Sequence, residues 1–272
     1  MGMWGRERKS YLDTAYEQST IRGAQENPLM RNIWIIGTRE FRQYFISPVA
    51  YAVAAMIFLV LGVIFYSNLG ASILNQYAPE GQAVLAPLAT LLLFGVPAIT
   101  MRLIADESRS GTIELLLTAP VRDAELVVGK WLGGMGFSLV VLAGTWIFPI
   151  ILNAITSPGI DQGPLVSSYL GMLLMIMAMV AIGVMASAMF ANPIASYFTT
   201  LGILLLLWVI SLPVQAASGT ASTVLSYLDF SGHFYNNAYA GVIDTRDIVY
   251  YVSLTALALF AGTRVVEARR WQ

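Results

Sequence analysis

Six long runs without any Asp, Glu, Lys or Arg constrain this chain more than any other feature of its sequence. They cover residues 49–69, 83–101, 131–155, 165–190, 194–214 and 248–262, of which the last is shorter than the others and flanked by charges. A helix that rises 1.5 Å per residue needs roughly 20 apolar residues to cross a hydrocarbon core about 30 Å thick. The runs therefore predict an all-α, polytopic membrane protein with six transmembrane helices.

Composition supports burial in a membrane and excludes several kinds of site. Of the 272 residues, 57% are apolar and 11% are charged, whereas a soluble domain carries roughly 25% charged residues. The chain has no Cys and one His, His233, which excludes disulfides, thiol catalysis and a multi-histidine metal centre. The net charge of −1 indicates no nucleic-acid partner. We therefore expect no catalytic residue, no bound metal and no cofactor on this chain.

The uncharged spans also bear on the source of energy. Ionisable groups inside a membrane are costly and usually mark proton relays or ion pathways. Their absence argues against proton coupling, although sodium held by backbone carbonyls remains an alternative. Energy is then expected to come from outside the bilayer.

Basic residues predict the orientation. Fourteen of the fifteen Lys and Arg residues fall on one side when six spans are drawn, and only Arg246 falls on the other. The positive-inside rule then places both termini in the cytoplasm. We expect a polar cytoplasmic tail at 1–28, a six-helix transmembrane domain at 47–264 and a basic cytoplasmic end at 265–272.

An amphipathic helix is predicted at 29–46, before the first span. Its apolar residues recur at helical spacing: Met30, Ile33, Trp34, Gly37, Phe41, Tyr44 and Phe45. Polar residues lie between them: Arg31, Arg39, Glu40 and Arg42. We expect this helix to lie along the inner membrane surface with its basic face toward lipid headgroups. The alternative is a helix packed on the cytoplasmic domain of a partner.

The segment 215–247, between the last two spans, is long and rich in aromatic residues. Such residues suit an interfacial or re-entrant helical pair that caps the outer face. An ordinary loop packed on the span ends is the alternative.

The cytoplasmic loop 102–130 contains a short apolar helix. Gly111 can end the incoming helix, Thr112 can cap the next one and Pro120 stops it. The helix at 113–118 has a broad leucine surface and Glu114 as its only charge. Such a surface must be buried, either under the membrane domain or in a groove of a soluble partner.

This loop resembles the signature loop of type-2 ABC transporter permeases. The similarity is carried by ESRSGTIELLLTAPV from Glu107 and ELVVGK from Glu125, with Arg39-Glu40-Phe41, Ser47-Pro48 and GVIDTRD from Gly241 as further matches. It extends over about residues 30–265. The branch that includes gliding-motility and multicopper-enzyme-maturation permeases is the most similar.

The resemblance implies a half-transporter in the inner membrane of a prokaryote, most simply an exporter. Its coupling helix would contact an ATP-binding cassette subunit, present in two copies, which uses ATP and Mg. A second permease chain, identical or related, would complete the complex. The implied contact residues are Thr112, Ile113, Glu114, Leu116, Leu117, Thr118 and Pro120, braced by Glu107, Arg109 and Gly111. Gly129 and Lys130 would open the third span.

The chain itself lacks the phosphate-binding pattern G-x-x-x-x-G-K-[ST], because Gly129-Lys130 is followed by Trp131. ATP is therefore expected to be hydrolysed by a separate polypeptide. The glycines at 133, 134 and 136 permit close helix approach, either between two permeases or within one subunit.

Two other functions compete with transport. A transporter-like subunit can pass ATP-driven movement to an extracytoplasmic auxiliary protein without moving a substrate. An intramembrane serine protease would pair His233 with a serine such as Ser187, but no G-x-S-x-G context is present.

Overall fold

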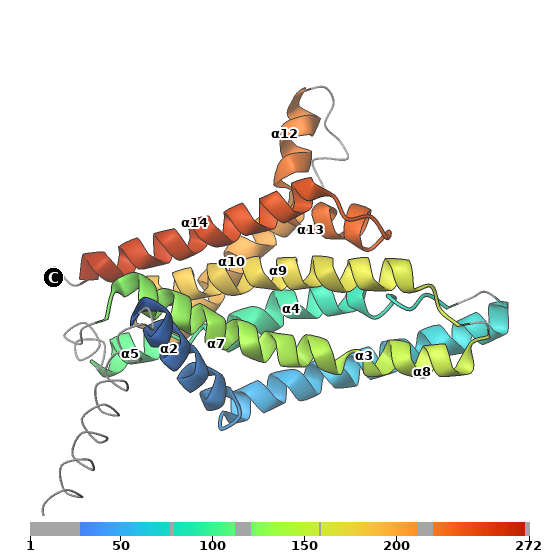
Figure 1. The fold of residues 1–272 in the computed structure, drawn as a ribbon, viewed down its shortest axis with the longest axis horizontal. Coiled ribbons are helices and arrows are strands. Elements are labelled where there is room, and N and C mark those ends of the chain that lie inside the picture. The colour runs from blue at the N-terminus through green and yellow to red at the C-terminus, as the bar shows by residue number, and fades with distance from the viewer. Residues whose placement is uncertain (1–27, 77–78, 112–120, 158, 211–219, 270–272) are drawn as a thin grey trace, which may run out of the picture.

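The computed structural model describes residues 28–76, 79–111, 121–157, 159–210 and 220–269, and every regular element in this part of the chain is a helix (Figure 1). The first half of the chain forms α2 (Pro28–Tyr44), α3 (Pro48–Asn75), α4 (Leu85–Thr100), α5 (Ala105–Ser110), α7 (Asp123–Gly144) and α8 (Ile147–Ile155). They are followed by α9 (Gln162–Met189), α10 (Pro193–Val209), α12 (Thr220–Leu228), α13 (Phe230–Gly232), the π-helix η1 (His233–Ala238) and α14 (Thr245–Arg269).

Five helical segments are long and apolar enough to cross a membrane: Pro48–Asn75, Leu85–Ser110, Asp123–Ile155, Gln162–Met189 and Thr245–Arg269. The predicted fifth span coincides with α10, an apolar helix of 17 residues, and its last part lies at 211–214, outside the described residues. The structure is thus that of a multi-pass helical membrane protein. The count of six spans stays a prediction, as does the tail at 1–28, of which the structure describes only Pro28.

Helix α9 is the centre of the bundle and α3 is at its edge. In the most apolar window of α9, 72% of the residues are buried, against 22% in α3. Helices α14, α4, α10 and α7 all contact α9. The outward side of α3 exposes large apolar residues such as Met56, Leu59 and Val63. A helix with such a surface suits lipid contact, because it would be costly in water.

The predicted third span is interrupted near its middle. Helix α7 ends at Gly144 and α8 begins at Ile147. Pro149 explains the break, because proline has no N–H and its ring clashes with the carbonyl four residues earlier, here that of Thr145. Helix α7 also begins at Asp123, eight residues before the predicted start at Trp131. Gly129 and Lys130 therefore lie within the helix and do not open it.

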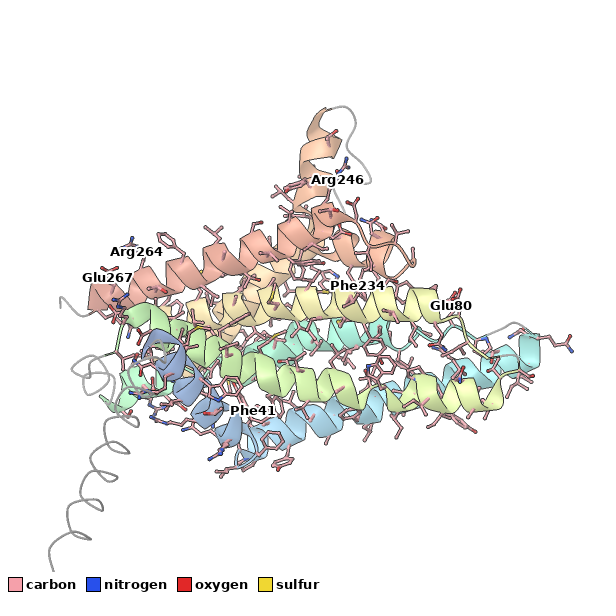
Figure 2. All side chains as sticks on the ribbon, viewed as in Figure 1. Phe41, Glu80, Phe234, Arg246, Arg264 and Glu267 are labelled. Carbon is pink, nitrogen blue, oxygen red and sulfur yellow. The ribbon has the colours of Figure 1, made fainter. Side chains whose placement is uncertain are left out.

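Charged residues gather at one end of the bundle, which we call the basic end. It is formed by α2, α5, the start of α7 and the end of α14 (Figure 1). Arg264 and Glu267 lie there, whereas Arg246, at the start of α14, lies toward the opposite end (Figure 2). This arrangement agrees with the basic residues used for orientation, but which end faces the cytoplasm stays a prediction.

The described part of segment 215–247 is largely helical and packs on the opposite half of the bundle. Figure 1 shows α12 projecting away from the bundle, while η1 contacts α9. Ser167 of α9 donates a hydrogen bond to the carbonyl oxygen of Ala238, at 2.9 Å. The predicted position of segment 215–247 at the outer surface of the bilayer stays a prediction.

Helices α2 and α7 make one of the most extensive contacts in the fold, and glycines allow it. A Cβ atom at Gly129 would lie 2.7 Å from Cβ of Ile36, and one at Gly133 would collide with Cβ of Glu40. A Cβ at Gly136 would lie 2.9 Å from the ring of Phe41, whereas Gly134 faces Val180 of α9. These glycines therefore serve packing within one subunit, not an interface between permeases.

We predict that Gly133→Ala destabilises the protein, because its new methyl group meets Glu40 and the backbone of α2. Overpacking of this kind costs on the order of 1–3 kcal/mol. The matched control is Gly202→Ala in α10, where a Cβ meets nothing within 4 Å. Thermal unfolding in detergent should show a lower midpoint for Gly133→Ala and an unchanged or slightly higher one for the control. Equal midpoints would contradict the proposed contact.

Candidate functional site: a buried polar junction at the basic end

Lys130 joins three helices at the basic end. Its Nζ lies 3.0 Å from Oε1 of Glu40 in α2 and 2.8 Å from Oε1 of Glu107 in α5. The side chains of Lys130, Glu40 and Glu107 are 1%, 6% and 16% exposed. Moving a charge out of water costs several kcal/mol unless it is paired and hydrogen-bonded. The three side chains therefore hold α2, α5 and α7 in a fixed relation.

The predicted polar face of α2 is wrong at Glu40. This residue was placed with the arginines facing lipid headgroups, but it is 5% exposed and faces α7. The physical reason is its ion pair with Lys130, which makes the inward position favourable for a carboxylate. Other residues of this helix are exposed, as a helix at the membrane surface requires: Arg31, Arg39, Arg42 and Trp34. Phe41 is partly buried and packs against Gly136.

A second polar contact fixes the start of α7. Glu125 is 5% exposed, and its Oε2 accepts a hydrogen bond from Nδ2 of Asn32 in α2 at 3.0 Å. The same oxygen accepts from the backbone N–H of Arg122 at 3.4 Å, as in a capping box. The segment that leads into α7 is thus tied to α2 independently of Lys130.

Ser187 of α9 fixes the corner between α4 and α5. Its Oγ accepts hydrogen bonds from the backbone N–H groups of Ile104, at 3.0 Å, and Ala105, at 3.1 Å. It donates to the carbonyl oxygen of Met101 at 3.2 Å. Buried backbone groups at a helix end need such partners. Sequence reasoning considered Ser187 only as a nucleophile and missed this role, which no local pattern signals.

Tyr44 links α2 to the end of α4. Its hydroxyl donates to the carbonyl oxygen of Ile99 at 3.1 Å, and its ring stacks on Phe137. Burial, and to a lesser extent the nearby Glu40 carboxylate, raise the pKa of the Tyr44 hydroxyl above its ordinary value. The hydroxyl therefore stays protonated and keeps donating at physiological pH.

The bracing residues of the predicted coupling segment lie at the end of α5. Glu107 contacts Lys130, Arg109 is exposed and Gly111 ends the helix with a φ of +73°. That left-handed conformation favours glycine, and the predicted helix end at Gly111 is confirmed. The predicted contact residues Thr112, Ile113, Glu114, Leu116, Leu117, Thr118 and Pro120 lie outside the described residues.

The structure separates the two residues proposed for a serine protease. His233 lies in η1, which contacts α9 beside Ser167, and Ser187 is twenty residues farther along α9, about 30 Å at the helical rise. His233 is held instead by Asp247, at 2.6 Å from Nδ1, and by the Tyr227 carbonyl oxygen. A nucleophile and its base must come within hydrogen-bond reach. This pair does not.

The arrangement at the basic end consists of buried polar contacts between helices. Within the described residues, no group of three His, Cys, Asp or Glu side chains could hold a metal ion. What the junction provides is a set of short polar contacts that link α2, α4, α5, α7 and α9. The fold and this junction define a multi-pass helical membrane protein with a rigid polar connection at one end.

Comparison with known proteins identifies the family. Residues 34–262 match the family described as ABC-2 family transporter protein, a region that includes most of α2, the polar junction and most of α14. No curated protein shows significant sequence similarity to the chain. The chain belongs to the ABC-2 transporter family and is a membrane component, or permease, of an ABC transporter.

We predict that Lys130→Met strongly destabilises the protein, because it leaves the Glu40 and Glu107 carboxylates buried without their cation. Breaking a buried ion pair from one side costs roughly 3–5 kcal/mol. Arg264→Met is the matched control, since its ion pair with Glu267 is exposed and such pairs contribute about 1 kcal/mol or less. Chemical unfolding in mixed micelles measures both losses.

Neutralising the two carboxylates tests the cause of that loss. In the Lys130→Met background, adding Glu40→Gln and Glu107→Gln should recover part of the stability, because no buried charge remains. A Lys130→Met variant as stable as Arg264→Met, or no recovery in the triple variant, would contradict the role assigned to the ion pairs.

Proposed function

We propose that this permease couples ATP hydrolysis by a separate cassette subunit to export of a substrate across the inner membrane. The observation that carries the proposal is the polar junction at the two helices that flank residues 112–120 in the sequence. Helix α5 ends at Gly111 before these residues, and α7 begins at Asp123 after them. Both flanks of the segment are therefore fixed in the polar junction, by Glu107 on one side and Glu125 on the other.

A displacement of this segment by the cassette would be transmitted to the membrane domain through the side-chain contacts of the junction. From α5 it passes through Glu107 and Lys130 to α7 and through Glu40 to α2. From the corner at Ile104 it passes through Ser187 to α9, the most buried helix. Packed helices with such contacts move as rigid bodies. The predicted leucine-rich helix at 113–118 would rest on the cassette and act as the lever.

The complex would contain two cassette subunits and two permease chains, identical or related. The cassettes would bind ATP and Mg. This chain would hold both termini in the cytoplasm, with the basic end on the inner side. Its membership of the ABC-2 family supports the association with a cassette subunit.

A second function is favoured by one feature of the opposite end. Helix α12 projects away from the bundle (Figure 1), and its last residues Tyr227 and Leu228 are exposed. Such a projection can contact an extracytoplasmic auxiliary protein and pass movement to it without transport. A substrate that changes the ATPase rate of the purified complex would favour export over this alternative.

The absence of native cysteine gives a direct test of orientation and contact. Single cysteines would be introduced as Arg109→Cys at the basic end, Asn75→Cys at the end of α3 and Glu114→Cys in the proposed lever. In intact cells, a membrane-impermeant maleimide should label Asn75→Cys alone. Labelling of Arg109→Cys from outside would reverse the orientation.

The Glu114→Cys variant then reports the contact with the cassette. A short photoactivatable crosslinker on this cysteine should join the chain to a copurifying subunit that mass spectrometry identifies as an ATP-binding cassette. The same reagent on Asn75→Cys should give no such product. No cassette at position 114, in a preparation that still contains the cassette, would contradict the placement of the lever.

Coupling itself is tested by Gly111→Val. A β-branched residue is strained at the left-handed conformation of Gly111, so the chain should enter the lever in a different direction. We expect insertion and copurification of the cassette to persist while the ATPase rate of the complex falls to that of the cassette alone. Gly62→Val, where a Cβ meets open space, is the control. Equal ATPase rates in the Gly111→Val and Gly62→Val complexes would count against the proposal.

A further inference from the structure

A cavity of about 340 Å³ lies at the basic end, where two candidate spans have their ends. It is bounded by α2, the start of α3, the end of α4, α5 and Lys130 of α7. One part of its lining is apolar, made by Val49, Ala50, Ala98 and Ile99. The other part is strongly polar. An amphipathic cavity at a span end lies where the headgroups of the bilayer meet its acyl chains.

The charges in this cavity divide into a paired set and an unpaired set. Lys130 is neutralised by Glu40 and Glu107. Arg39, Arg102 and Asp106 also line the cavity, and among the residues that the structure describes none of these three makes an ion pair. Arg102 and Asp106 are one helical turn apart, since the Asp106 N–H donates to the Arg102 carbonyl oxygen at 3.4 Å.

The unpaired groups have the chemistry of a zwitterion receptor. A guanidinium offers forked N–H donors that match phosphate oxygens, and two line this cavity. The Asp106 carboxylate accepts hydrogen bonds and attracts an ammonium group. Counting Lys130, Arg39 and Arg102 against Glu40, Glu107 and Asp106, the lining is neutral overall. A ligand with one phosphate and one amine fits this balance better than an anion.

We propose that this cavity binds the headgroup of an amine-bearing, zwitterionic phospholipid. The phosphate lies against Arg39 and Arg102, and the amine lies toward Asp106. The acyl chains leave the cavity over its apolar part and continue along α3 and α4. The bound lipid bridges α2 and the corner between α4 and α5, so it adds a link to the polar junction. The proposal does not depend on the coupling function, because binding is measured without a cassette.

The test uses the full-length chain, delipidated in detergent and titrated with lipids under native mass spectrometry. Four probes are compared: dioleoylphosphatidylethanolamine, dioleoylphosphatidylglycerol, dioleoylglycerol and the soluble headgroup glycerophosphoethanolamine. The wild-type chain should bind the ethanolamine lipid most tightly and the phosphatidylglycerol more weakly. Dioleoylglycerol, which lacks the phosphate, should bind least of the three lipids.

Variants separate the phosphate from the amine. The double variant Arg39→Gln with Arg102→Gln should lose affinity for both phospholipids by roughly tenfold or more, since a hydrogen bond between charged partners commonly accounts for that factor. Asp106→Asn should keep phosphate binding and lose the preference for ethanolamine over glycerol. The control, Arg31→Gln with Arg42→Gln, removes two exposed charges of α2 that do not line the cavity and should bind as the wild type does.

Several results would overturn the proposal. Equal binding of dioleoylglycerol and the phospholipids would show that no phosphate is recognised. An equal loss in the Arg31 and Arg42 control would show diffuse attraction to headgroups. Tight binding of soluble glycerophosphoethanolamine would assign the site to a free metabolite. If the double glutamine variant does not fold, Arg39→Lys with Arg102→Lys replaces it, and the wild-type lipid series alone still decides between a phosphate site and an apolar one.

Discussion

A buried ammonium group between two carboxylates is the constraint on which the basic end of this permease depends. Lys130 is almost completely removed from solvent, and its two partners come from two helices that precede α7 in the sequence, α2 and α5. The cost of desolvating such a group is several kcal/mol, and only the presence of both carboxylates offsets it. Lys130 therefore links α7 to both α2 and α5, in addition to the contact between Asn32 and Glu125 that also holds α2. Any movement of α5 changes the surroundings of that ammonium group and so affects α2.

The ion pair between Glu40 and Lys130 forms because α2 and α7 approach each other closely. A carboxylate on α2 reaches Lys130 because Gly129 and Gly133 let the two backbones come together, with Glu40 seated over Gly133. In a membrane, where lipid is as apolar as a leucine side chain, helices associate through such small residues and through polar contacts. Here both devices act at the same crossing. The helix that was expected to lie on the membrane surface is consequently part of the folded core at its Glu40 side and exposed at its Trp34 side.

Buried polar groups have different partners at the two ends of the bundle. At the basic end, charges are paired around Lys130, and the corner of α4 and α5 uses the hydroxyl of Ser187. At the opposite end, His233 and Asp247 hold η1 to the first turn of α14, surrounded by tyrosine rings. Both sets of polar residues lie toward span ends, and this leaves the middle of the spans apolar. Such a division suits a bilayer, because buried charges and unpaired backbone groups are most costly in the middle of the hydrocarbon core.

The sequence by itself determined the class of fold, the apolar runs and the helix end at Gly111, because these depend on hydropathy over about twenty residues or on the backbone preference of one residue. It also carried the resemblance that the family match over 34–262 supports. Only the tertiary structure decided the inward position of Glu40, the partners of Lys130, the structural role of Ser187 and the cavity lined by Arg39, Arg102 and Asp106. Those contacts join residues 23 to 90 positions apart, and no local pattern encodes which distant side chain will neutralise a buried charge.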